Sequence, residues 1–236
     1  MVRNAADKKD LTKVSYSFIP SLECNNECSF CMYGASPTNK ARLGYEDTMR
    51  FMLTVKWGKV VGWGLYGGEP SIDLPLYQQF YELLPEKLSK FIITNGAWST
   101  DKILTKTFLD WCAYKFEVII SGTKEHRKYQ DVAFLKRLVQ GCKGVIYKPV
   151  DEEMHPMGRL ARDVWKCTRK CNWHEQVMRL GIFPTGDIIM QNCDGVYPVV
   201  GHIKTTTFTE AFDEGVRVRM GGCGRRCKNV NDLIGG

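Results

Sequence analysis

Between residues 14 and 150, short β-rich segments alternate with helical segments at intervals of roughly 25–30 residues. The strands are expected at Val14–Ile19, Lys59–Tyr66, Lys90–Thr94, Phe116–Ser121 and Gly144–Val150. The helices are expected at Tyr45–Val55, Leu74–Leu84, Asp101–Ala113 and Val132–Cys142. Such alternation is typical of βαβ units, in which each helix crosses over the face of a parallel sheet.

The number of strands limits the fold further. Five strands are visible, and a sixth is expected beyond Arg179. These are too few for a closed eight-stranded barrel. We therefore predict an α/β fold, an open partial (β/α) TIM-like barrel of about 5–6 parallel strands. A small cysteine-rich appendage follows it at the C-terminus.

The rhythm breaks after Asp151, where acidic residues and cysteine pairs replace the alternating pattern. We predict a flexible N-terminal tail over residues 1–13, a barrel over 14–155 and a cysteine-rich region over 156–236. The chain has ordinary globular composition, no apolar run of membrane-spanning length and a polar start. We expect a cytoplasmic protein without membrane attachment. Its ten cysteines therefore favour metal binding or catalysis over disulfides.

The net charge of +7 includes a basic cluster around the last cysteine pair. Its members are Arg217, Arg219, Arg225, Arg226 and Lys228. This cluster could meet an anionic substrate, a phosphate or a nucleic acid. A solvated surface is an equally good interpretation.

Three cysteines, Cys24, Cys28 and Cys31, occupy one short loop directly after the first expected strand. Iron–sulfur clusters prefer thiolate ligands, and a four-iron cluster needs four of them. Nothing else in the loop supplies a fourth, so one iron is left open for an exogenous molecule. Phe30 is placed to shield such a cluster from water.

This spacing, with an aromatic residue before the last cysteine, resembles the signature of the radical S-adenosylmethionine (SAM) superfamily. The resemblance implies that SAM occupies the open iron of a [4Fe–4S] cluster. Reductive cleavage of SAM there yields a 5′-deoxyadenosyl radical, which abstracts hydrogen from a substrate. It also implies an electron donor of the flavodoxin or ferredoxin type.

Other segments extend the resemblance over about residues 14–150. Gly67-Gly68-Glu69-Pro70 looks like the family's GGEP motif, which meets the amino group of SAM. Thr94 and Ser121, which end the third and fourth strands, resemble positions where a hydroxyl contacts the cofactor. Lys148 is a candidate partner for the carboxylate of SAM. Each of these residues also has a structural interpretation: the glycines, Thr94 and Ser121 as turn residues, and Lys148 as a solvated lysine.

A second set of cysteines, Cys171, Cys193, Cys223 and Cys227, lies beyond the barrel. Together with a hairpin expected around Gly186, this set resembles a SPASM or twitch region, which implies an auxiliary iron–sulfur cluster. Cys167 could replace Cys171 as a ligand. A structural zinc site and uncoordinated thiols remain alternatives. Cys112 and Cys142 are expected in the core.

The function that the resemblance implies is that of a radical SAM enzyme acting on a small polar or anionic molecule or a peptide. Modification of a nucleobase or nucleic acid, including 7-deazaguanine-type chemistry, is the alternative within the class. Outside it stand a zinc-bearing nucleic-acid-binding protein and an iron–sulfur electron carrier. His126 is expected to have a surface or packing role.

Overall fold

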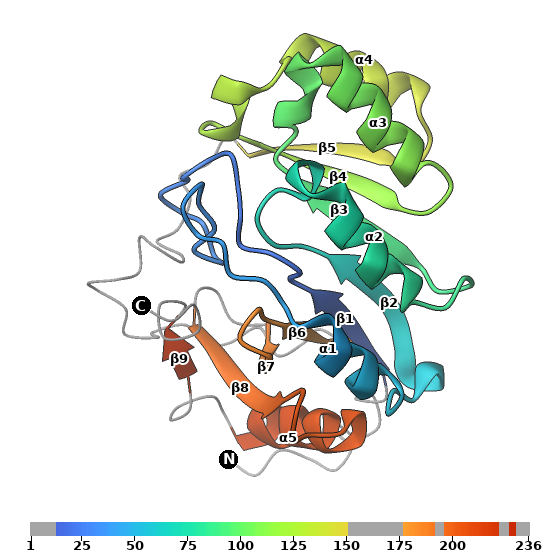
Figure 1. Ribbon diagram of the computed structural model, residues 1–236, viewed down its shortest axis with the longest axis vertical. Coiled ribbons are helices and arrows are strands. Elements are labelled where there is room, and N and C mark those ends of the chain that lie inside the picture. The colour runs from blue at the N-terminus through green and yellow to red at the C-terminus, as the bar shows by residue number, and fades with distance from the viewer. Residues whose placement is uncertain (1–12, 151–176, 192–195, 222–226, 230–236) are drawn as a thin grey trace.

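The computed structural model describes residues 13–150, 177–191, 196–221 and 227–229 (Figure 1). Their strands are β1 (Lys13–Phe18), β2 (Val60–Leu65), β3 (Lys90–Thr94), β4 (Glu117–Thr123), β5 (Val145–Val150), β6 (Val177–Ile182), β7 (Asp187–Met190), β8 (Val196–His202) and β9 (Cys227–Asn229). They form one sheet in the order β5-β4-β3-β2-β1-β6-β7-β8-β9.

The six strands from β5 to β6 are parallel, and β7, β8 and β9 add antiparallel pairs at the other edge. The sheet is open, so the prediction of an open partial barrel with about 5–6 parallel strands is confirmed. The sixth parallel strand is β6, which begins two residues before Arg179. It lies beside β1, where Ser15 pairs with Arg179, and not beside β5.

The helices of the described residues are α1 (Tyr45–Met52), α2 (Leu74–Glu82), α3 (Lys102–Cys112), α4 (Val132–Gly141) and α5 (Phe208–Gly221). Three of them begin after an aspartate whose carboxylate accepts backbone N–H groups of the first turn. These N-caps are Asp73, Asp101 and Asp131. Such caps satisfy donors that have no partner within the helix, which explains why the helices start at these residues.

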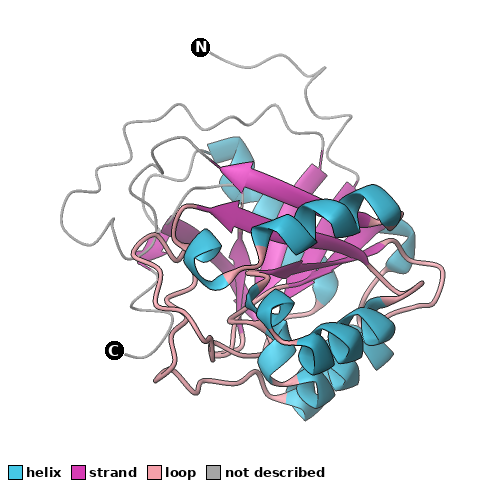
Figure 2. Ribbon diagram, turned by 90° about the horizontal axis from the view of Figure 1, so that it is seen from above, coloured by secondary structure: helices cyan, strands magenta, loops and turns pink. Residues whose placement is uncertain are grey.

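The main core lies between the sheet and the helices, which pack along it in the two perpendicular views of Figures 1 and 2. Alternate side chains of each strand point to this face, as the pleat requires. On β1, Tyr16 stacks on Trp63 of β2 with ring centroids 4.9 Å apart. The ring of Phe208 on α5 packs against Tyr16 with ring centroids 5.5 Å apart, so α5 covers this part of the core.

The two cysteines that were predicted to lie in the core, Cys112 and Cys142, differ in burial. Cys112, at the end of α3, is buried as expected. Cys142 is exposed, so that prediction is wrong. It follows the last residue of α4 as its C-cap and thus lies beyond the stripe of the helix that faces the sheet.

The hairpin expected around Gly186 is present, formed by β6 and β7. Gly186 has a φ of +89°, a backbone conformation that favours glycine in a tight turn. Through β6 this hairpin extends the barrel's own sheet. The predicted boundary near residue 155 falls on 151–176, and the predicted tail falls on 1–13; both lie almost wholly outside the described residues. Within the described parts of the chain, no helix is long and apolar enough to cross a membrane.

Because β1 to β5 are parallel, their carboxyl ends meet at one edge of the sheet. The segments after Phe18, Leu65, Thr94 and Thr123 therefore come together there. Ligand sites in folds of this kind form at the carboxyl ends of the strands.

Candidate iron–sulfur and cofactor site

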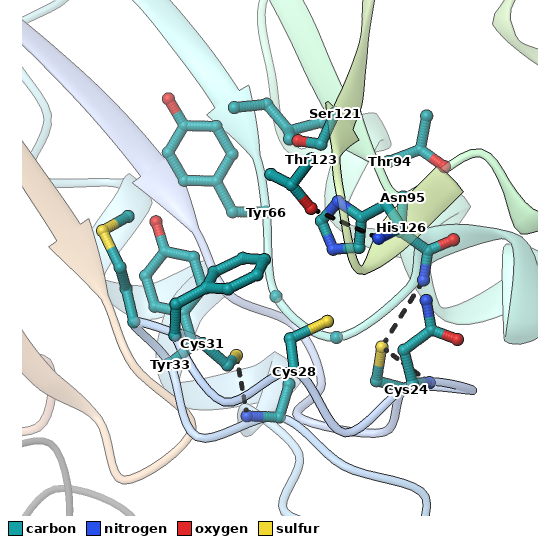
Figure 3. Close-up of a pocket in the computed structure, with 17 residues that line it drawn as sticks. Cys24, Cys28, Cys31, Tyr33, Tyr66, Thr94, Asn95, Ser121, Thr123 and His126 are labelled. Atoms are coloured by element: carbon teal, nitrogen blue, oxygen red, sulfur yellow. Dashed lines mark hydrogen bonds between the residues drawn. The ribbon is translucent and has the colours of Figure 1, made fainter. Parts of the chain in front are cut away.

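The cysteine loop leaves β1 and folds back over the carboxyl edge of the sheet (Figure 3). Cys28 is buried, while Cys24 and Cys31 are partly exposed. Backbone bonds fix the loop: the Cys31 N–H donates to the Cys28 carbonyl at 3.1 Å, and the Cys24 N–H donates to the carbonyl of Ser36 at 3.1 Å. These backbone bonds define the shape of the loop.

The glycines after β2 bring the backbone against this loop. The Gly68 N–H donates to the Ser21 carbonyl at 2.8 Å. Gly67 has a φ of +138°, and a Cβ there would lie 2.4 Å from the same carbonyl oxygen. The paired glycines are thus required for contact with the cysteine loop itself, besides any approach to a ligand.

One cavity of about 290 Å³ joins these elements. Eight of the predicted site residues line it: Cys24, Cys28, Phe30, Cys31, Gly67, Gly68, Thr94 and Ser121. The remaining lining residues are Asn26, Met32, Tyr33, Ala35, Tyr66, Ile93, Asn95, Thr123 and His126. Aromatic and aliphatic groups form much of the wall, and polar atoms enter from the strand ends, as is usual for ligand sites.

The side chain of Glu69 does not line this cavity. It is 1% exposed, and its carboxylate accepts hydrogen bonds from Thr94 Oγ1 at 2.7 Å and from the Asn95 N–H at 2.7 Å. It also accepts the Ser71 N–H at 3.1 Å. Burial raises the pKa of Glu69, and these three donors oppose the rise. The carboxylate ties the end of β2 to the end of β3; a contact of Glu69 with a cofactor stays a prediction.

The three other predicted polar contacts differ in their surroundings. Thr94 lines the cavity, but its hydroxyl already donates to Glu69 and accepts from Trp98 Nε1 at 2.9 Å. Ser121 lines the cavity at the end of β4. Lys148 pairs with Ser121 in register but is exposed and lies outside the cavity lining. Its contact with a carboxylate stays a prediction.

Among the lining residues that were absent from the predicted cofactor contacts, three have nitrogen-bearing side chains: Asn26, Asn95 and His126. Both amide atoms of Asn26 and the Nδ1 atom of His126 are buried without a hydrogen-bond partner. The His126 ring packs edge-on against Phe30 at 5.6 Å, so the expected packing role is joined by a place in the cavity wall. The sequence signal for Asn95 was its position beside Thr94 in a strand-end turn; nothing distinguishes Asn26 from its neighbour Asn25.

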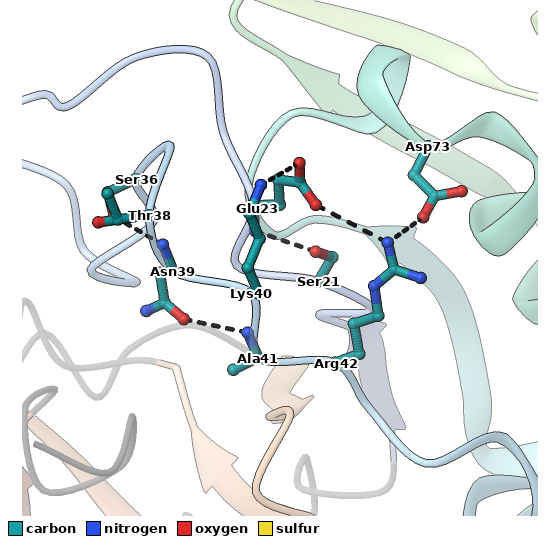
Figure 4. Close-up of polar contacts among 9 residues, drawn as sticks. All are labelled: Ser21, Glu23, Ser36, Thr38, Asn39, Lys40, Ala41, Arg42 and Asp73. Atoms are coloured by element: carbon teal, nitrogen blue, oxygen red, sulfur yellow. Dashed lines mark hydrogen bonds and ion pairs between the residues drawn. The ribbon is translucent and has the colours of Figure 1, made fainter.

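The cysteine loop is also held from outside the cavity. Ser29 donates from its N–H and its hydroxyl to the two carboxylate oxygens of Glu125, at 3.1 and 2.6 Å. On the opposite side, Lys40 pairs with Glu23 at 2.5 Å, next to Cys24 (Figure 4). Hydrogen bonds and ion pairs therefore hold the loop on both sides.

The electrostatics of the loop bear on what it could hold. Burial raises the pKa of the Cys24 thiol to about 12, opposed by N–H donors from Asn26 and Asn95. A thiolate at this position needs a cation to stabilise it, and an iron cluster provides one. Among described residues, no three His, Cys, Asp or Glu side chains converge as ligands of a single metal ion do. The three cysteines line one cavity at separate positions, and a cubane takes each thiolate at a different iron.

The second set of predicted metal ligands lies largely outside the described residues. This applies to Cys171, Cys193 and Cys223, and to the alternative ligand Cys167. Cys227 begins β9, where it pairs with Pro198 of β8. The auxiliary site stays a prediction.

Comparison with known proteins identifies the fold. No protein-family model matches the chain, and no curated protein matches its sequence. The crystal structure of BtrN in complex with AdoMet and 2-DOIA is similar with a TM-score of 0.54 and 15% identity, over 93% of this chain and 94% of BtrN. Native anSMEcpe with bound AdoMet has a TM-score of 0.53 and 16% identity, over 86% and 82% of the two chains. The open, mostly parallel sheet of this chain is thus the partial TIM-like fold that these two structures share.

Proposed function

We propose that this chain is a radical SAM enzyme in which Cys24, Cys28 and Cys31 bind a [4Fe–4S] cluster. The observation that carries the proposal is the shared cavity at the carboxyl ends of the parallel strands. It brings the three cysteines together with the two glycines after β2. Two solved structures with this fold contain AdoMet, which supports the same cofactor here.

The residues fit this cofactor pair in two respects. The unpartnered amide of Asn26 and Nδ1 of His126 offer hydrogen bonds to a polar ligand. The aromatic rings of Phe30, Tyr33 and Tyr66 offer an apolar wall against a purine or a sulfonium-bearing chain. Buried polar groups without a partner are rare, and a missing ligand is a common reason for them.

When bound, the cluster and SAM would supply reductive cleavage to a 5′-deoxyadenosyl radical. The chain's own residues would position both groups and exclude water. The three cysteines would leave one iron free of protein ligands. Phe30, held edge-on by His126, would cover the cluster, and the backbone of Gly67 and Gly68 would receive the amino group of SAM.

The partners remain part of the proposal. We expect a flavodoxin- or ferredoxin-type protein to supply the electron, and a small polar or anionic molecule or a peptide as substrate. The BtrN structure holds 2-DOIA together with AdoMet, so this fold can accommodate a second ligand beside the cofactor. We place an auxiliary iron–sulfur cluster at the second set of cysteines.

The test uses the full chain, purified and reconstituted with iron and sulfide without oxygen. Dithionite and SAM are added, iron is counted, and 5′-deoxyadenosine is sought by mass spectrometry. Product with about eight irons per chain supports both clusters, and product with about four supports the SAM cluster alone. A fully loaded protein that forms no 5′-deoxyadenosine would refute the proposed function and favour an electron carrier. A colourless zinc protein would favour the nucleic-acid-binding alternative.

A further inference from the structure

The side chain of Asn95, at the end of β3, reaches the first cysteine of the loop (Figure 3). Its Nδ2 atom lies 3.6 Å from Cys24 Sγ and 2.8 Å from Asn25 Oδ1. Asn95 is 7% exposed, so water competes little for this amide. The Nδ2 atom of Asn95 therefore has two acceptors within the cysteine loop.

Building on the proposed function, we propose that Asn95 is a positioning residue that holds Cys24 and raises the reduction potential of the cluster. It would do so by donating an N–H···S hydrogen bond to the Cys24 thiolate. Reduction adds negative charge to the cluster and its sulfur ligands. Donors aimed at those sulfurs stabilise the reduced form more than the oxidised form, and such bonds are among the factors that set cluster potentials.

The orientation of the amide is fixed by its surroundings. Asn95 Oδ1 accepts the Ala97 N–H at 2.9 Å, so the carbonyl side of the amide faces away from Cys24. An amide flipped by 180° would lose that bond and present an oxygen to the sulfur. The N–H side is therefore the side that meets Cys24.

The backbone of Asn95 is equally constrained. Its N–H donates to Glu69 Oε2 at 2.7 Å, and its carbonyl accepts from Gln130 Nε2 at 2.5 Å. The buried Glu69 carboxylate therefore has a structural role, because it holds Asn95, the residue that contacts Cys24. The motif after β2 thus acts on the cluster through Asn95.

Other contacts of the loop provide a matched control. Cys31 Sγ accepts the backbone N–H of Ala35 at 3.3 Å, which no side-chain substitution removes. Ser29 contacts Glu125 by two hydrogen bonds, neither of which involves a sulfur. Ser29→Ala therefore loosens the loop without removing a donor to a cysteine, whereas substitution of Asn95 removes that donor.

The experiment compares wild type, Asn95→Leu, Asn95→Asp and Ser29→Ala, each reconstituted without oxygen. Potentials are measured by redox titration, following the electron paramagnetic resonance signal that changes on adding SAM, which marks the SAM cluster. We expect Asn95→Leu to lower the equilibrium constant for reduction by about tenfold, a shift of about 59 mV for one electron. Asn95→Asp should shift further in the same direction because it adds a negative charge. Ser29→Ala should keep the wild-type potential.

The outcomes separate the two proposals. Wild-type protein that binds no cluster, or a loaded protein that ignores SAM, refutes the proposed function and leaves the role of Asn95 without a basis. A loaded Asn95 variant with the wild-type potential overturns the inference alone, as does a shift of equal size in Ser29→Ala. Loss of iron from Asn95→Leu and Asn95→Asp, with iron retained in Ser29→Ala, would support the positioning role of Asn95. In that case the reduction potential is measured on Asn95→Ser instead.

Discussion

A Cβ atom on Gly68 would lie 1.7 Å from the backbone carbonyl oxygen of Glu23, the residue directly before Cys24. The Glu69 N–H donates to that same carbonyl at 2.9 Å. The end of β2 and the start of the cysteine loop are therefore in direct backbone contact. No side-chain rotation could relieve a substitution at this position, because both partners are backbone.

Substitution of Gly68 by Ala is expected to displace the cysteine loop. We expect the free energy of unfolding to fall by about 3 kcal/mol and reconstituted iron to be lost, since forced overlap must move one of the two segments. The matched control is Gly58→Ala, where an added Cβ meets nothing within 4 Å. Chemical denaturation and iron analysis provide the measurements, and a stable, fully loaded Gly68→Ala protein would contradict this reading of the contact.

Each of the three loop cysteines should be indispensable for cofactor cleavage. Substituting Cys24, Cys28 or Cys31 by Ala should abolish 5′-deoxyadenosine formation and lower the iron content by about four per chain. Iron that remains would belong to the second set of cysteines. Cys142→Ala is the control, because Cys142 is an exposed free thiol outside the cavity lining. Unchanged product formation in any loop variant would remove that cysteine from the ligand set.

Much of the barrel was predictable because its strands and helices are encoded locally. The strand Lys90–Thr94 matches its prediction at both ends, and the helix from Val132 begins where expected. Period-2 and period-3.6 patterns depend only on neighbouring residues, so one sequence suffices to read them. The loop motifs likewise placed the cysteines and the glycines on the same edge of the sheet.

What the sequence could not provide were relationships between distant segments. The pairing of β6 with β1 joins residues more than 160 positions apart, and no local pattern specifies it. The motif after β2 predicts a contact between Glu69 and a ligand, but it does not indicate that the end of β3 supplies two donors to the same carboxylate. The same distant packing turned Asn95 toward Cys24.

Acidification should test the environment of His126. Burial lowers the pKa of His126 from its ordinary value of 6.5. Below pH 6.5 the unfolded chain then binds more protons than the folded chain, so the stabilising contribution is full above that pH and is lost as the pH falls through the folded-state pKa. Urea unfolding of the iron-free chain between about pH 7.5 and 5.5 should therefore show a smaller loss of stability for His126→Phe than for wild type. Parallel curves for the two proteins would contradict a buried His126.

The ion pairs at the base of the cysteine loop should matter for cluster retention more than for global stability. Arg42 lies 2.7 Å from Asp73 and 3.7 Å from Glu23, and its side chain is 52% exposed (Figure 4). Exposed pairs of this kind contribute about 1 kcal/mol or less, so Arg42→Ala should leave the unfolding transition almost unchanged.

Locally, however, Glu23 adjoins Cys24, and loss of Arg42, one of its two cationic partners beside Lys40, should let the loop open more often. We therefore expect Arg42→Ala to release iron to a chelator faster than wild type at low salt, with a smaller difference at about 0.5 M salt, where the pairs are screened. Arg50→Ala, which removes an exposed pair with Asp47 on α1, is the control and should release iron at the wild-type rate. Equal acceleration in Arg50→Ala, or an effect of Arg42→Ala that salt does not reduce, would show that charge pairing at Arg42 does not hold the loop.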